Sequence, residues 1–149
     1  METGVSQLTL SIAQRIIGEA LAHARELKLK PLAIVVLDDR GAVRAAMSED
    51  GTSLRRYEIA HGKAYGALAL GTGSRSIVKR AKEQPYFIAA ASHIAGGALI
   101  PVAGGVLLQS RQGVLFGAVG ASGDTSENDE RVVLAGIAAA DLVGDPGVD

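Results

Sequence analysis

Cysteine and tryptophan are both absent from this chain of 149 residues, and aromatic residues make up only 3% of it. The absence of cysteine excludes disulfide bonds, thiolate metal sites and a cysteine nucleophile. It also fits a reducing compartment, and we expect a cytoplasmic location. Because aromatic side chains are so few, the core must be built from Ala, Val, Leu and Ile. Small side chains of this kind favour close packing of elements over large aromatic anchors.

An excess of either charge is also lacking. Fifteen basic residues stand against sixteen acidic ones, which argues against a general nucleic-acid-binding role. The charges are unevenly distributed, however, because seven basic residues lie between positions 55 and 82, while the chain after position 113 is mainly acidic. These two regions either meet across a subunit boundary or form ordinary solvated faces.

Residues 86–108 form a segment of 23 residues without a formal charge, which is long enough to span a membrane. Two glycine pairs, a proline and several polar residues interrupt it, and they would break a helix and leave polar groups in lipid. We therefore expect this segment to be buried backbone in a protein or an oligomer, with no membrane partner. The N-terminus also lacks the basic and apolar regions of a signal peptide.

The hydrophobic pattern divides the chain into helices and short strands. Apolar residues recur with helical spacing at residues 10–29, about 54–70, 75–84 and from Thr125 or Ser126 to about 143. Short apolar runs predict strands at residues 32–37, 42–47, 99–103, 106–110 and 114–121. Residues 86–95 are of mixed character. Gly41 lies between the first two strands and supplies the positive φ that a tight hairpin needs.

The first predicted helix has its own start and stop signals. Ser11 and Gln14 have the spacing of a capping box, and Pro31 cannot continue a helix. Hairpins that are joined without helical crossovers predict an antiparallel sheet with helices on its faces. We therefore expect one α+β domain over residues 1–149, with loose ends at about 1–7 and 144–149.

Glycine is concentrated in residues 101–130, where two apolar runs lead into an acidic helix start. The glycines of interest are Gly104, Gly105, Gly120 and Gly123. Glycine at this density marks backbone that turns or lies close to something else. A strand, another subunit or a ligand would each satisfy that spacing.

This stretch resembles the signature of the GlcG/HbpS family, in which a P-x-x-G-G segment precedes a G-A-x-G-x-S-G strand end. The segments VVLDDRG at 35–41 and AHGKA at 60–64 are also similar to that family, so the resemblance extends over nearly the whole chain. It implies a five-stranded antiparallel sheet flanked by helices, loosely profilin-like, in homo-oligomers from dimers upward. It also implies a small-molecule ligand, with haem or another tetrapyrrole first, since relatives bind haem and a similar domain occurs in PduO-type proteins.

One motif departs from the family. Its usual R-M-D-G reads Ser48, Glu49, Asp50 and Gly51 here, so the arginine is missing. If that arginine helps to hold an anionic ligand in relatives, this chain either lacks the contact or uses Arg55 or Arg56 instead.

Lys63 stands out among the charged residues because it follows Ala60 by three positions, beside the buried stripe of its helix. Partial desolvation there would lower its pKa and suit it to act as an acid, a base or an anion contact. The alternative is a lysine whose stem covers apolar surface while its amine reaches water. In the catalytic interpretation, Asp129 and Glu130 assist Lys63 as carboxylates at the start of the last helix.

The loop that contains Gly120, Ser122 and Gly123 leads into that helix and offers free backbone N–H groups. Acidic residues crowd the same turn, complement the helix dipole and disfavour phosphate, so a structural cap is the competing interpretation. In the ligand-binding interpretation, this loop and the Gly104-Gly105 pair contact the ligand.

The three histidines form no local ligand pair, and we predict no metal site. Haem nevertheless needs only one axial imidazole beside an apolar slot. His23 and His93 are the candidates, because both are expected beside buried surface, whereas His61 simply lies on the second helix. A packed or interfacial histidine is the alternative in each case.

Three functions remain open from the sequence. The first is a protein that binds a small ligand or tetrapyrrole. The second is an enzyme that acts on a small organic acid or carbonyl compound by proton transfer through Lys63. The third is a structural or accessory subunit whose glycine pairs are filled by neighbouring chains. The abundance of Ala and Gly around residues 87–105 predicts at least a dimer.

Overall fold

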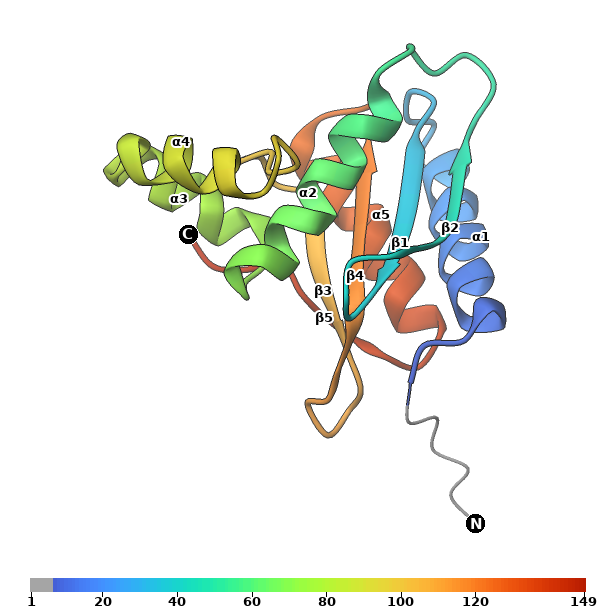
Figure 1. The fold of residues 1–149 in the computed structure, drawn as a ribbon. Coiled ribbons are helices and arrows are strands. Elements are labelled where there is room, and N and C mark those ends of the chain that lie inside the picture. The colour runs from blue at the N-terminus through green and yellow to red at the C-terminus, as the bar shows by residue number, and fades with distance from the viewer. Residues whose placement is uncertain (1–6) are drawn as a thin grey trace.

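The computed structural model describes residues 7–149 as one α+β unit with a five-stranded antiparallel sheet (Figure 1). The strand order is β2-β1-β4-β3-β5, and all neighbouring strands run antiparallel. The elements are α1 (Leu10–Glu26), β1 (Ala33–Asp38), β2 (Val43–Ser48), α2 (Arg56–Leu70), α3 (Ser74–Glu83), α4 (Pro85–Ile94), β3 (Gly105–Gln109), β4 (Leu115–Ser122), α5 (Ser126–Ala139) and β5 (Val143–Asp145). The predicted fold class is therefore confirmed. Most of the expected N-terminal loose end, residues 1–6, lies outside the described residues.

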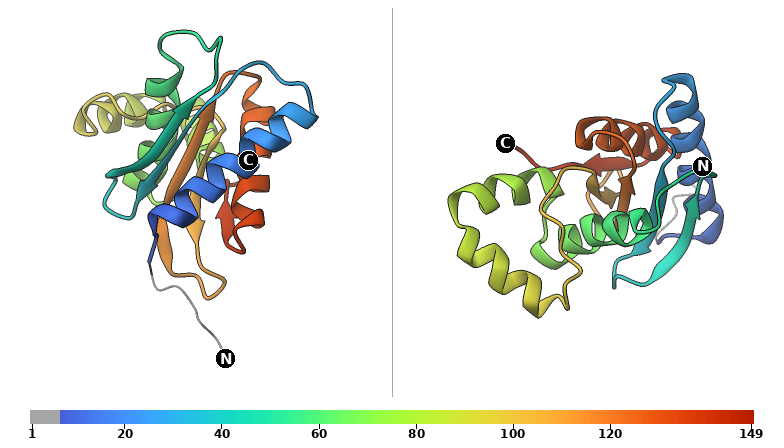
Figure 2. Two further views of the ribbon diagram at one scale, coloured as in Figure 1. Left: turned by 90° about the vertical axis from the view of Figure 1, so that its right-hand side faces the viewer. Right: turned by 90° about the horizontal axis from the view of Figure 1, so that it is seen from above.

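Helices cover both faces of the sheet (Figure 2). Helices α1 and α5 pack on one face, where the core includes Ile34 and Val36 of β1. Helix α2 packs on the other face against Val35 and Leu37 of the same strand. Strand β1 is consequently buried along its whole length, as its continuous apolar run predicts.

Strand β2 is an edge of the sheet and is mostly exposed. Helix α2 lies mainly over β1, β3 and β4, so it leaves the side chains of β2 on this face largely uncovered. Ala46 pairs with Val35 and Val43 pairs with Leu37, which places these two exposed side chains on the face that α2 covers elsewhere.

Helices α3 and α4 form a helical hairpin that extends away from the sheet (Figure 1). Residues 86–95, which the sequence left unassigned, are thus mainly helical. Pro85 is compatible with this helix because it lies in the first turn of α4, where its missing N–H costs nothing. Ile77, Ile88 and Leu99 hold the hairpin together. Among residues 7–149, no helix is both long and apolar enough to cross a membrane.

The strand predicted at residues 99–103 is wrong. That segment instead crosses α2, where the Ile100 N–H donates to the Gly62 carbonyl and Leu99 lies against Gly66. The N–H of Ile100 is thus bonded to a helix rather than a strand, and Pro101 has no N–H to offer a strand.

The fifth strand is β5, inside the C-terminal region that was predicted to be part helix and part loose end. Helix α5 ends at Ala139, and Asp141 adopts a left-handed φ of 60° that turns the chain back. Strand β5 then pairs with β3, and the Arg75 N–H donates to the Pro146 carbonyl. The expectation of a loose end at 144–149 is therefore wrong, because β3 and α3 offer unpaired backbone groups that this segment satisfies.

Helix α1 also differs at both ends from its predicted bounds. Its N-cap is Thr9, whose hydroxyl accepts from the Ile12 N–H, rather than a capping box at Ser11. It ends at Glu26 instead of residue 29, since Lys28 adopts a left-handed φ of 57° and the Leu29 N–H bonds back to the Ala24 carbonyl. Pro31 is therefore not what stops it.

Candidate functional site

Lys63 and Asp129 form an ion pair in the interior, between α2 and the first turn of α5. The Lys63 Nζ lies 3.1 Å from Asp129 Oδ2 and donates to the Ala121 carbonyl at 3.0 Å. The two side chains are only 3% and 2% exposed. Burial lowers the pKa of Lys63, and the charge of Asp129 opposes that shift. Of the two alternatives that the sequence left open, Lys63 is therefore the desolvated lysine and not one whose amine reaches water, whereas its catalytic role stays a prediction.

The surroundings of this pair are already satisfied by the protein. Asp129 uses its second oxygen, Oδ1, to accept from the Asp124 N–H at 3.0 Å. Within residues 7–149, every buried side-chain nitrogen or oxygen has a hydrogen-bond partner. Lys63 of α2 therefore links this helix to β4 through Ala121 and to α5 through Asp129.

Glu130, which follows Asp129, has a different partner. It is buried and forms a bidentate contact with Arg75 of α3, with Arg75 Nε 3.1 Å from Oε1 and Nη2 on Oε2. Arg75 also reaches the exposed carboxylate of Asp149 at 3.3 Å. The structure thus brings Lys63 and Asp129 together and directs Glu130 to the contact between α5 and α3.

Gly104, Gly105 and Gly120 allow α2 to pack closely against the sheet, because they have no side chains. A Cβ on Gly105 would lie 2.1 Å from the Lys63 carbonyl oxygen, and one on Gly120 would lie 2.1 Å from that of Ala60. At Gly104, where φ is 121°, a Cβ would meet Lys63 Nζ at 3.0 Å. The sequence did not show what lies against these glycines. In the structure it is α2 of the same chain, which occupies the space that side chains would fill.

The N-terminus of α5 is closed by its own residues. Thr125 is the N-cap and accepts from the Asn128 N–H at 3.1 Å. Asp124 accepts from the Asn128 side chain, the Lys30 N–H and the Thr125 N–H, and these hydrogen bonds lower the pKa of Asp124 to about 2. This turn is a structural cap, since side-chain oxygens already occupy its donors.

The remaining residues of that loop are also engaged. A Cβ on Gly123 would meet the Pro31 carbonyl oxygen at 2.1 Å. Ser122 is fully buried and its hydroxyl accepts from Arg56 Nη1 at 3.1 Å. Arg55 pairs with Glu58 at 2.7 Å. Both arginines that were expected to replace the missing family arginine therefore have partners within the chain.

The two histidines predicted as axial ligands lie on different helices. His23 is partly buried in the last turn of α1. His93 is exposed in the last turn of α4, so the expectation that it neighbours buried surface is wrong, because α4 extends away from the sheet. Neither contacts the Lys63–Asp129 pair. No group of three or more potential metal ligands occurs within the described residues.

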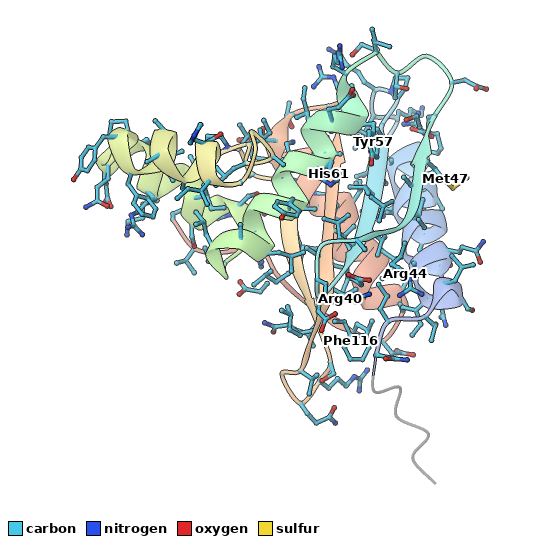
Figure 3. All side chains as sticks on the ribbon, viewed as in Figure 1. Arg40, Arg44, Met47, Tyr57, His61 and Phe116 are labelled. Atoms are coloured by element: carbon cyan, nitrogen blue, oxygen red, sulfur yellow. The ribbon has the colours of Figure 1, made fainter. Side chains whose placement is uncertain are left out.

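His61 is the histidine that sequence reasoning passed over. It is partly buried on α2, one turn after Tyr57 (Figure 3), and Tyr65 follows it by one turn. Its ring is nearly parallel to that of Tyr65, at 16° and 5.6 Å between centroids, and it is tilted by 41° to that of Tyr57 at 6.1 Å. Burial lowers the pKa of His61 below its ordinary value. The signal that was available is the placement of three of the few aromatic rings at successive helical turns.

The imidazole of His61 is accessible although it is partly buried. Its ring nitrogens make no hydrogen bond to another residue within 7–149, and no buried side-chain nitrogen in that range lacks a partner. Both nitrogens therefore reach the surface. Tyr65 lies over the β1–β2 turn, where a Cβ on Gly41 would be 2.7 Å from its ring. The line of rings thus runs along α2 beside the exposed strand β2.

Two surface clefts lie beside β2, and neither is lined by Tyr57, His61 or Tyr65. One, of about 430 Å³, lies between α1 and β2 and is lined by Arg25, Met47 and Glu49 among others. The other, of about 330 Å³, lies near the β1–β2 turn and includes Arg40 and Arg44. In the first cleft, Glu49 holds Arg25 at 3.0 Å, so the residue that departs from the family motif forms an internal ion pair.

The fold and its interior define a class of protein: a five-stranded antiparallel sheet held to α2 by a buried lysine–carboxylate pair. The model of the HbpS-like family, described as haem degrading protein HbpS-like, matches residues 8–138. The chain therefore belongs to the HbpS-like family. A comparison with curated proteins found no match.

Solved structures share this fold. The chain is 25% identical to a structure described as a PduOC:heme complex, with a TM-score of 0.81 over 91% of this chain and 96% of that one. It is 23% identical to Klebsiella pneumoniae protein ORFY, with a TM-score of 0.80 over 94% and 96% of the two chains. A double mutant of Streptomyces reticuli HbpS is also 23% identical, with a TM-score of 0.77 over 92% and 89%. The last two likenesses show the fold alone.

Proposed function

We propose that this chain binds haem, or another tetrapyrrole, through one histidine side chain. The observation that carries the proposal is the accessible imidazole of His61, which has no hydrogen-bond partner among residues 7–149, in a family whose description names haem. The similar PduOC structure, which holds heme, supports the same ligand class. Haem iron needs one axial imidazole and an apolar surface for the porphyrin, and both are available in this chain.

A bound haem would supply an iron centre able to exchange electrons and bind small ligands. The chain's own contribution would be to bind and orient the porphyrin. A neutral imidazole offers the lone pair for ligation, and basic side chains pair with carboxylates of the kind that haem carries.

The test is an absorbance titration of the purified chain with hemin. We expect a Soret band that shifts and saturates at one hemin per chain, with hemin in buffer and hemin with the urea-unfolded chain as references. A titration that never saturates, or one that matches the unfolded chain, contradicts haem binding. The absorbance of the Soret band, followed over time with ascorbate as reductant, would also separate stable haem binding from degradation of the porphyrin.

The second candidate function is an enzyme that moves a proton on a small organic acid or carbonyl compound. The observation in its favour is the desolvated Lys63 in contact with Asp129. A substrate would reach Nζ only after the hydrogen bonds to Asp129 and Ala121 open. Deuterium exchange from heavy water into small ketones and carboxylic acids tests this function, and exchange that persists in Lys63→Met would contradict the role of Lys63.

We further propose that the chain forms homo-oligomers. The α4 helix exposes large apolar side chains, with Tyr86 73% and Ile94 86% accessible. Large apolar side chains that are this exposed would be covered if α4 packed against a second copy of the chain. The third hypothesis, a purely structural subunit, would require the hemin titration to fail while this association persists. The cytoplasmic location stays a prediction.

A further inference from the structure

We infer that His61 is the axial ligand of the tetrapyrrole and that Tyr57 and Tyr65 hold its imidazole in the ligating orientation. This inference rests on the proposed function and deepens it, since it assigns the ligand to a residue, a helix and a face of the sheet. It replaces His23 and His93 as the histidines expected from the sequence.

The local surface distinguishes His61 from the other two histidines. On a helix, the residues four before and four after a given position lie next to it. For His61 these neighbours are Tyr57 and Tyr65, which are packed against the core under α2. For His23 the same positions hold Glu19 and Leu27. Each histidine also has a glutamate three residues away, Glu26 for His23 and Glu58 for His61, so the two sites differ in the rings that flank His61 on both sides.

His93 lacks comparable support. It is exposed at the end of α4, and the residues one turn before it are Ala89 and Ala90, which are themselves exposed and small. Exposed apolar side chains do occur on α4, with Tyr86 two turns before His93 and Ile94 next to it, but no ring lies one turn away from His93 to orient its imidazole.

The tyrosines control how the imidazole can turn. An imidazole binds a metal through a lone pair that lies in its ring plane, so its edge must face the metal. Tyr65, which is almost parallel to His61, covers one ring face and leaves the edge free. Because both nitrogens of His61 reach the surface, the edge is available for ligation.

The strand next to this line of rings supplies apolar surface. Val43 of β2 is 46% exposed, and it pairs with Leu37, which belongs to the same core cluster as Tyr57 and Tyr65. Helix α2 leaves this part of the sheet uncovered. A porphyrin ligated by His61 can therefore bury side chains that the isolated chain leaves in water, which favours binding.

A cation lies at one end of the same surface. Arg40 belongs to the turn that Tyr65 covers, its side chain is 84% exposed, and its contact with Asp38 is long at 3.9 Å. Arg55 and Arg56 are engaged with Glu58 and Ser122. We therefore assign Arg40 to a carboxylate of the ligand, where a guanidinium makes strong charge-assisted hydrogen bonds.

The experiment is a set of hemin titrations on wild type and four variants: His61→Ala, His61→Phe, His23→Ala and His93→Ala. Both His61 variants are expected to lose the Soret position of the wild type and to bind hemin roughly tenfold or more weakly. The variants at His23 and His93 are expected to match the wild type. His61→Phe keeps a ring between the tyrosines, so it separates loss of the ligand from loss of the fold, which circular dichroism checks.

Two further readouts separate ligation from positioning. Excess imidazole is expected to restore the wild-type spectrum in His61→Ala, because it can occupy the space between the tyrosines. Tyr65→Ala is expected to shift or broaden the Soret band of bound haem, because the imidazole is no longer held in one orientation, while Tyr65→Phe keeps the ring and the wild-type spectrum. Arg40→Ala is expected to weaken binding by roughly three- to tenfold without moving the Soret band.

The outcomes distinguish this inference from the proposed function. Saturable hemin binding that survives both His61 variants and is lost in His23→Ala or His93→Ala overturns the inference and leaves haem binding intact. If the wild type itself shows no saturable binding, both fail. Wild-type spectra in Tyr65→Ala overturn the positioning role of that ring.

Discussion

Lys63 places a positive charge where water does not reach, and Asp129 compensates that charge. An ion pair in the interior contributes little net stability, but it becomes costly when one partner is removed, because the other charge stays buried. The pair therefore specifies how α2, β4 and α5 meet. Its position beside the Gly104-Gly105 backbone places Lys63 against two residues that have no side chain.

We expect Lys63→Met to lower the free energy of unfolding by about 3–5 kcal/mol, because Asp129 is left buried and unpaired. The measurement is urea unfolding followed by circular dichroism. The double variant Lys63→Met/Asp129→Asn removes both charges and keeps an acceptor for the Asp124 N–H. It should recover a large part of the loss, and equal stability of the single and double variants would contradict the ion-pair interpretation.

Asp124 makes the stability of the cap depend on pH. Hydrogen bonds from Asn128, Lys30 and Thr125 lower its pKa from an ordinary value of 3.8 to about 2. Because the folded state has the lower pKa, the stabilisation is complete above pH 3.8 and is lost as the pH falls towards 2. After allowance for partial solvent screening, we expect Asp124→Ala to cost about 1–2 kcal/mol at neutral pH.

Urea unfolding at pH 7 and at pH 2.5 measures that dependence, and the difference between wild type and Asp124→Ala should shrink at the lower pH. Asp39→Ala is the matched control, since Asp39 is exposed in the β1–β2 turn. A stability difference for Asp124→Ala that is the same at both pH values would show that the hydrogen bonds do not depend on its charge.

At the scale of elements, the position of α2 on the sheet depends on glycine. Gly105 and Gly120 of adjacent strands pair with each other, and each faces a backbone carbonyl of α2. Side chains at these positions would separate the helix from the strands and open the Lys63 site. The close approach therefore organises the interior between α2 and the sheet.

We expect Gly105→Ala to lower stability by about 1–3 kcal/mol or more, because its Cβ would overlap the Lys63 carbonyl and α2 would have to move. Gly18→Ala is the control. Gly18 lies within α1 with nothing inside 4 Å of an added Cβ, so alanine should raise stability by about 0.5–1 kcal/mol. Thermal unfolding of both variants should therefore give shifts of opposite sign, and a neutral Gly105→Ala would contradict the close packing.

The element assignments that failed have a common cause. The segments at residues 99–103 and 143–145 are both short, and local pattern alone cannot show which of them finds a strand to pair with. Strand β5 is accommodated beside β3, while the segment at 99–103 donates its backbone N–H to α2. The helix at 85–94 was missed because small and aromatic residues without polar alternation give no helical periodicity.

For the whole molecule, the projecting α3–α4 hairpin is the surface that we expect to self-associate. Light scattering at micromolar concentration should give at least twice the mass of one chain. Ile94→Asp should reduce that mass, because a charge on α4 would be desolvated in an interface. Leu54→Asp is a matched control, since Leu54 is also 86% exposed but lies outside the hairpin. A monomer mass for the wild type would contradict this prediction.

The sequence by itself determined the fold class, the double-sided burial of β1 and the Gly41 turn. Each of these follows from composition or from the spacing of neighbours along the chain, which are local properties. The resemblance to the family also required only local motifs.

Only the tertiary structure decided which side chains contact one another and which are exposed. It shows that Lys63 meets Asp129 while Glu130 meets Arg75, and that Gly104, Gly105 and Gly120 face α2. It also shows that His93 stands in solvent while His61 lies between two rings beside an uncovered strand. These facts depend on contacts between residues far apart in the chain, and the exposure of a side chain is set by those contacts rather than by its own sequence neighbours.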